Sequence, residues 1–129
     1  MIETKELFYA FVFMRMFIFW NVLAVLFMIF AWVQINDPDP WMWFSLYLIN
    51  AFTLMGAANQ KTSTILSSAF FTACVISAYI HWPPTFDGFA GNMSQNPHIE
   101  LARESAGLLL IALSQVGIIM YSVPKGKAS

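Results

Sequence analysis

The stretch RMFIFWNVLAVLFMIFAWVQINDPDPWMW, residues 15–43, joins a long apolar run to a polar turn and to the start of a second apolar run. From Met16 to Val33 the run contains no charged residue. A helix needs about 20 such residues to cross a hydrocarbon core of ~30 Å at 1.5 Å per residue. The stretch therefore predicts a membrane-spanning helix, a tight turn outside the hydrocarbon, and a second helix that returns.

The composition of the whole chain agrees with this interpretation. Of its 129 residues, 59% are hydrophobic and only 10% are charged, whereas about a quarter of the residues of a soluble domain are charged. The net charge of −1 offers no basic surface for a nucleic acid. We predict an all-α fold, an integral-membrane four-helix bundle that forms one transmembrane domain over residues 1–129.

Four apolar runs have the length of membrane spans. They cover about residues 15–34, 41–58, 64–81 and 105–123. The apolar segment LFYAFVFM before the first run either extends the same helix or lies in the membrane interface. The last helix is expected to begin earlier than its span, near Pro97, because Asn96 and Pro97 form a typical N-cap and first-turn pair.

The basic residues predict the orientation. Lys5 and Arg15 precede the first span, Lys61 lies between spans two and three, and Lys125 and Lys127 follow the fourth. Only Arg103 falls on the other side. Short loops rich in lysine and arginine stay in the cytoplasm, so we expect the N-in, C-in topology, in the plasma membrane or a bacterial inner membrane.

Small and polar residues suggest how the helices pack, because helices in lipid associate through close backbone approach and hydrogen bonds. Ala69, Ala73 and Ser77 recur every four residues and predict the close-packing face of span three. Asn21 and Asn50 lie inside spans one and two, where we expect each to bond across to a neighbouring helix. Span three could also pack laterally against a membrane-protein partner or a second copy of the chain.

The turn NDPDP has two interpretations that stay open. In the structural one, Asp39 caps the second helix, Pro40 begins it, Pro38 keeps Asp37 out of the helical region, and Asn36 bonds back within the turn. In the functional one, the same side chains form one wall of a binding site.

The head of the last helix supplies the second wall. Glu100 and Glu104 share a helical face with Gly107, Ser114 and Gln115, residues that belong inside a membrane protein. The acids should therefore point toward the mouth of the bundle, with Arg103 within reach of Glu100. The alternative is a solvated first turn whose acids favour the helix N-terminus.

Together the two walls give the candidate site. Its residues are Asn36, Asp37, Asp39, Glu100, Arg103 and Glu104. Carboxylates in this number suit a divalent cation such as calcium or magnesium, or zinc if His81 or His98 joins them. Taken singly, His81 is expected to be an interfacial side chain and His98 a solvated one. The sequence favours a non-enzymatic module that binds a ligand, ion or partner. The alternative is a membrane enzyme that uses Arg103 and the carboxylates on a lipid-like substrate.

The chain resembles a known family over essentially its whole length, and two segments carry the most specific part of the resemblance. VQINDPDPWMWFSLY (residues 33–47) and ELARESAGLLL (residues 100–110) resemble, in order and distance, the two signatures of the transmembrane protein 220 family of small four-helix membrane proteins. The resemblance supports the topology and implies no activity. The matching residues are Gln34, Asn36, Asp37, Pro38, Asp39, Trp43, Tyr47, Glu100, Arg103, Glu104, Gly107 and Leu108.

Overall fold

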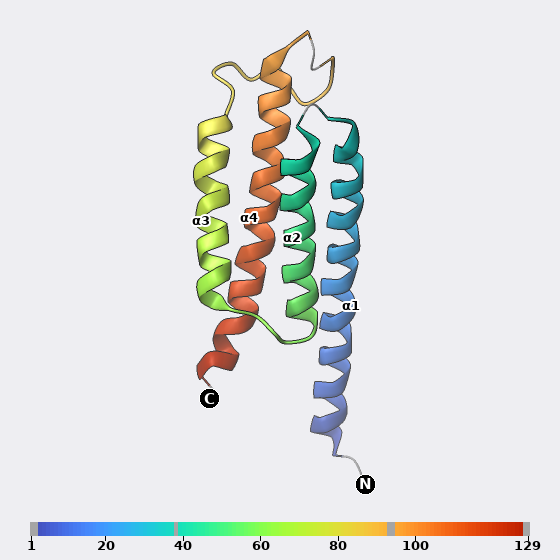
Figure 1. Cartoon of the computed structure of the whole chain (residues 1–129). Helices are drawn as coiled ribbons and strands as arrows, with labels where there is room; N and C mark the ends of the chain where they lie inside the picture. Colours follow the sequence, from blue (N-terminus) through green and yellow to red (C-terminus); the bar gives the residue numbers. More distant parts are fainter. Residues whose placement is uncertain (1–2, 38, 93–94, 128–129) are drawn as a thin grey trace. The chain divides into compact units, whose positions relative to one another are not determined.

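The computed structural model describes residues 3–37, 39–92 and 95–127, the last five of these as backbone only. This part of the chain contains four α-helices, one short 3-10 helix and no strand, as Figure 1 shows. All four α-helices are long and apolar enough to cross a membrane. The predicted all-α class is confirmed. The chain forms two compact helical hairpins, residues 1–62 and 63–129, each of which is described by itself.

In the first hairpin, α1 (Thr4–Val33) leads through the 3-10 helix η1 (Gln34–Asn36) into α2 (Pro40–Ala58). The segment LFYAFVFM extends α1, which is one continuous helix of 30 residues. The guanidinium of Arg15 lies 4.7 Å from the centre of the Phe11 ring, a cation–π contact within this helix.

Helix α1 packs along α2 through a narrow stripe of residues three and four positions apart. The buried members of the stripe are Trp20, Ala24, Phe27 and Ala31. The Tyr47 ring of α2 meets two rings of α1, with centroids 6.1 Å from Phe27 and 5.9 Å from Phe30. Alanines between the rings let the two backbones approach, so the hairpin is held by aromatic packing at the turn end and by small residues along its length.

The end of α2 is a tight return of the chain. Gln60 takes the left-handed conformation with φ 58°, Lys61 N–H donates to the Gly56 carbonyl at 2.7 Å, and Gln60 N–H donates to the Ala57 carbonyl at 3.1 Å. These two bonds make a Schellman motif with glutamine in the position that usually holds glycine. A β-carbon on Gly56 would lie 2.7 Å from the Lys61 carbonyl oxygen, so glycine is required where the chain folds back.

In the second hairpin, α3 (Thr64–His81) packs along α4 (Pro97–Lys127). Ser63 is the N-cap of α3, and its hydroxyl accepts a hydrogen bond from Leu66 N–H. The buried hydroxyl of Ser105 on α4 donates to the Ala78 carbonyl of α3 at 3.1 Å, which joins the two helices directly.

Two expectations about packing are wrong. Of the predicted face, Ala69 and Ala73 are exposed and Ser77 is half-buried, and the buried residues of α3 are instead Ser67, Cys74 and Ala78. Small residues lie on more than one face of α3, so spacing alone did not identify the face that meets α4. Asn21 does not bond across to α2, because its side-chain amide donates to the Phe17 carbonyl one turn earlier in its own helix.

Candidate functional site

The loop of the first hairpin presents its polar side chains at the end of α1. After η1, Asp37 N–H donates to the Gln34 carbonyl at 3.0 Å, which closes the turn, and α2 begins at Pro40 as expected. Asn36 and Asp39 are exposed and Asp37 is half-buried. Pro38 lies outside the described residues.

Asp39 departs from its expected role. It occupies the N-cap position of α2, with φ −118° and ψ 61°, but its side chain makes no capping hydrogen bond. Proline suits the first helical position because its fixed φ matches that of a helix. The helix begins without a capping bond from this carboxylate, and the Asp39 side chain is exposed.

The head of α4 has the predicted N-cap. Asn96 precedes Pro97, and its side-chain oxygen accepts a hydrogen bond from His98 N–H at 3.0 Å. Behind it, Glu100 and Glu104 are half-buried and Arg103 is exposed. The face that carries the two glutamates continues into a buried stripe, which confirms the pattern seen in the sequence. The buried members of the stripe are Gly107, Ile111, Ser114, Gln115 and Ile118.

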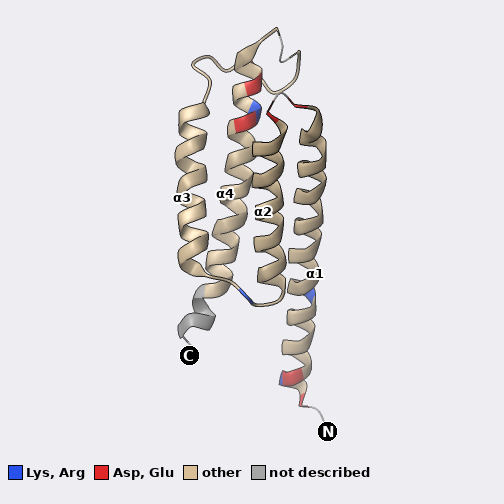
Figure 2. Cartoon of the chain, viewed as in Figure 1, with Lys and Arg blue, Asp and Glu red and all other residues tan. Residues whose placement is uncertain are grey.

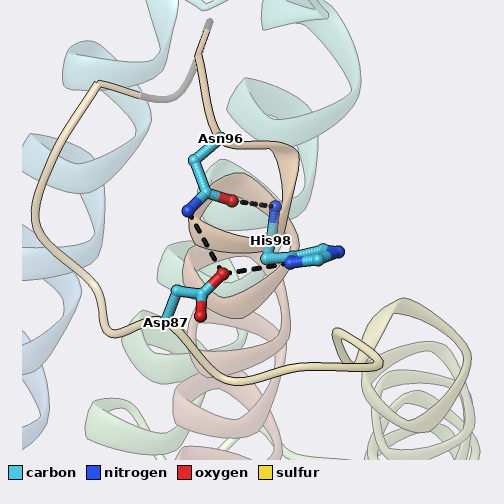
Figure 3. Close-up of polar contacts among 3 residues, drawn as sticks. All are labelled: Asp87, Asn96 and His98. Atoms are coloured by element: carbon cyan, nitrogen blue, oxygen red, sulfur yellow. Dashed lines mark hydrogen bonds and ion pairs between the residues drawn. The ribbon is translucent and has the colours of Figure 1, made fainter.

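A cluster that the sequence did not predict lies beside this helix head. Asp87, in the α3–α4 loop, accepts two hydrogen bonds on one carboxylate oxygen, from Asn96 Nδ2 at 3.2 Å and from His98 Nδ1 at 3.0 Å (Figure 3). A carboxylate can only accept, so Nδ1 of His98 carries the proton in this contact. His98 is thus hydrogen-bonded, whereas we expected it to be solvated.

The electrostatics of Asp87 follow from this geometry. Hydrogen bonds from Asn96 and then from His98, with a smaller attraction to the His98 charge, lower the pKa of the Asp87 carboxyl below its ordinary value. Donors that favour the ionised form act in this direction. The cluster therefore holds a charged carboxylate against the first turn of α4, with the His98 and Asp87 side chains 35% and 37% exposed.

The other histidine is anchored within its own helix. Nδ1 of His81 lies 2.8 Å from the Ser77 carbonyl, at the end of α3, where we expected an interfacial side chain. Within the described part of each hairpin, no group of three or more His, Cys, Asp or Glu residues is arranged to hold a metal ion. In the second hairpin, the Asp87–His98 contact brings together two such residues.

The predicted site residues divide between the two hairpins. Asn36, Asp37 and Asp39 belong to the first, and Glu100, Arg103 and Glu104 belong to the second. Figure 2 shows acids at the turn of the first hairpin and mixed charges at the head of α4. The meeting of these two groups stays a prediction.

Comparison with known proteins identifies the family. A family model described as "Transmembrane family 220, helix" matches residues 26–120, a range that contains both the NDPDP turn and the charged head of α4. No curated protein and no solved structure matches the chain. Because the matched range covers well over half of the 129 residues, this chain belongs to transmembrane family 220 and is a multi-pass membrane protein with four candidate spans.

Proposed function

We propose that this protein is a non-enzymatic membrane module that binds a ligand, ion or partner at a polar mouth on the outward side. The mouth consists of Asn36, Asp37, Asp39, Glu100, Arg103 and Glu104. Both termini are cytoplasmic in this proposal, and the host is the plasma membrane or a bacterial inner membrane, because five of the six basic residues lie on the side of the termini.

The observation that carries the proposal is the number of candidate spans. In this proposal each of the four candidate spans crosses the bilayer once, which brings the α1–α2 loop and the α3–α4 loop to the same side. The first loop presents Asp37 and Asp39, and the head of α4, which directly follows the second loop, presents Glu100 and Glu104. All four acids are at least partly exposed, and Arg103 is exposed beside the two glutamates. Carboxylates and a guanidinium that share one membrane surface can bind a cation or an anionic group once they lie close together.

Cross-linking tests whether the α1–α2 loop and the head of α4 meet. With Cys74 replaced by serine, Asp37→Cys and Glu104→Cys are introduced together, and a short bifunctional thiol reagent is added to native membranes. We expect an intramolecular cross-link in this pair. The control pair, Asp37→Cys with Lys61→Cys, places thiols at opposite ends of α2, whose 19 residues span roughly 28 Å. A cross-link in neither pair would refute the shared mouth.

Calorimetric titration with calcium, and then with magnesium, tests the cation version of the proposal. We expect Asp37→Asn and Glu104→Gln each to weaken binding by about tenfold, since one charge-assisted contact contributes about 1.5 kcal/mol or more. Glu6→Gln is the matched control, because it removes the same charge near the start of α1. Equal affinity in all variants would contradict cation binding at the mouth.

The exposure of Arg103 between Glu100 and Glu104 supports the second candidate, an enzyme acting on a lipid-like substrate. A guanidinium binds a phosphate or carboxylate through two parallel hydrogen bonds, which lysine cannot reproduce. In vesicles of anionic phospholipid, an enzyme would lose turnover in Arg103→Lys. For a binding module we expect no turnover in either form of the protein.

A further inference from the structure

The α3–α4 loop carries an aromatic cluster of three residues, Trp82, Phe86 and Phe89. The rings of Trp82 and Phe86 are stacked, with centroids 6.0 Å apart and planes 3° apart, and Phe89 meets Phe86 edge-on at 5.2 Å. Each side chain remains about half exposed, at 49%, 53% and 50%. The three rings therefore form one ordered apolar surface that the described residues do not cover.

This surface continues the lipid-facing side of a candidate membrane span. On the last turns of α3, Ile76, Tyr79 and Ile80 are 54%, 84% and 71% exposed, and a spanning helix presents such residues to lipid. Trp82 follows His81, the last residue of the helix. The aromatic cluster thus begins with Trp82 where the span ends, at the depth where tryptophan and tyrosine are enriched in membrane proteins.

The loop is held in this shape by contacts with the head of α4. Asp87, between Phe86 and Phe89 in sequence, is turned toward α4 and hydrogen-bonded by Asn96 and His98 (Figure 3). Gly91 adopts φ 135°, and a β-carbon there would lie 2.8 Å from the Cδ1 atom of the buried Ile99. The one charged side chain of the loop between Trp82 and Gly91 is therefore bonded to protein, which favours placing the loop against a lipid surface.

We infer that the aromatic cluster Trp82, Phe86 and Phe89 is a membrane-interface anchor, which inserts among the lipid head groups at the end of α3. The phenyl rings of Phe86 and Phe89 gain from leaving water at this boundary, and the indole of Trp82 does so while its N–H stays hydrated. The anchor would hold the α3–α4 loop, and with it the start of α4, at a fixed depth. This role is independent of what binds at the proposed mouth.

The test uses a fluorescent reporter of depth. In the Cys74→Ser background, Phe86→Cys and Phe89→Cys are labelled separately with a nitrobenzoxadiazole probe and reconstituted in phosphatidylcholine vesicles. Gln95→Cys, exposed in the same loop, is the control. We expect blue-shifted emission at positions 86 and 89, stronger quenching by brominated phosphatidylcholine than at position 95, and weaker quenching by iodide.

Two results would overturn the anchor. Iodide quenching that is equal at all three positions would place the cluster in water. Protection from both iodide and brominated lipid would mean that protein covers the rings. Helical circular dichroism and a monodisperse elution profile in each variant ensure that the labels report on folded protein. Each variant removes one ring of the cluster, so the same emission shift and quenching at positions 86 and 89 show that the loss of one ring does not produce the result.

Discussion

The Ser105 hydroxyl of α4 donates a hydrogen bond to the Ala78 carbonyl of α3 across 3.1 Å, and Ser105 is fully buried. Ala78 lies in the last turn of α3, where carbonyl groups have no partner within the helix. One side chain therefore joins two helices and supplies a partner that the end of α3 lacks.

Ser105→Ala should destabilise the second hairpin by about 1 kcal/mol, because it removes an interhelical bond and leaves a helix-end carbonyl without it. The measurement is thermal unfolding in detergent, followed by circular dichroism. Thr72→Val is the control, since it deletes a hydroxyl that bonds only one turn back, to the Ser68 carbonyl. If both variants unfolded alike, the interhelical bond would contribute nothing.

The return of the chain after α2 predicts two opposite effects from substitutions four residues apart. Gly56→Ala should destabilise the protein, because the new β-carbon would lie 2.7 Å from the Lys61 carbonyl oxygen. Gln60→Gly should stabilise it by about 1 kcal/mol, because glycine adopts the left-handed conformation without strain. Thermal unfolding of the two variants checks both signs. A destabilising Gln60→Gly would show that the side chain matters more than the backbone conformation.

The lowered pKa of Asp87 predicts a stability difference that depends on pH. A carboxyl whose pKa is lower in the folded state stabilises the fold above its unfolded pKa, which is about 4. That stabilisation disappears as pH falls through the lower folded value. Wild-type protein should therefore exceed Asp87→Asn in Tm near neutral pH, and the margin should shrink as the pH falls below about 4.

The control for this measurement is Asp39→Asn, which removes a carboxylate that makes no capping bond. Its Tm should differ little from that of the wild type at any pH. A margin for Asp87→Asn that does not change with pH would show that charge on the carboxylate is not what holds the loop.

Packing along α4 should differ sharply between two neighbouring positions. Ile111 has no exposed surface, whereas Leu113 is 68% exposed. Ile111→Ala should cost about 2–4 kcal/mol through the cavity it leaves. Leu113→Ala, which exchanges one lipid-facing apolar side chain for another, should change the Tm little. Equal losses in the two variants would mean that α4 buries a different face from the one described.

The local parts of the structure could be predicted from the sequence. The lengths of the apolar runs determined the four α-helices, and the prolines at positions 40 and 97 marked where α2 and α4 begin. Each of these features depends on a few consecutive residues, because helix starts follow from backbone groups within one turn. The Asn96 cap was predictable for the same reason.

Only the tertiary structure decided which face of a helix is buried and which side chains of a loop meet. Ala69 and Ala73 repeat as regularly as the buried residues of α3, and only the packing of α3 along α4 shows which face is buried. Asp87 and His98 lie 11 residues apart, so their contact depends on the path of the whole loop and not on a periodic pattern. Helix formation is a property of the nearby chain, whereas the choice of a buried face or of a loop contact requires a second element to pack against.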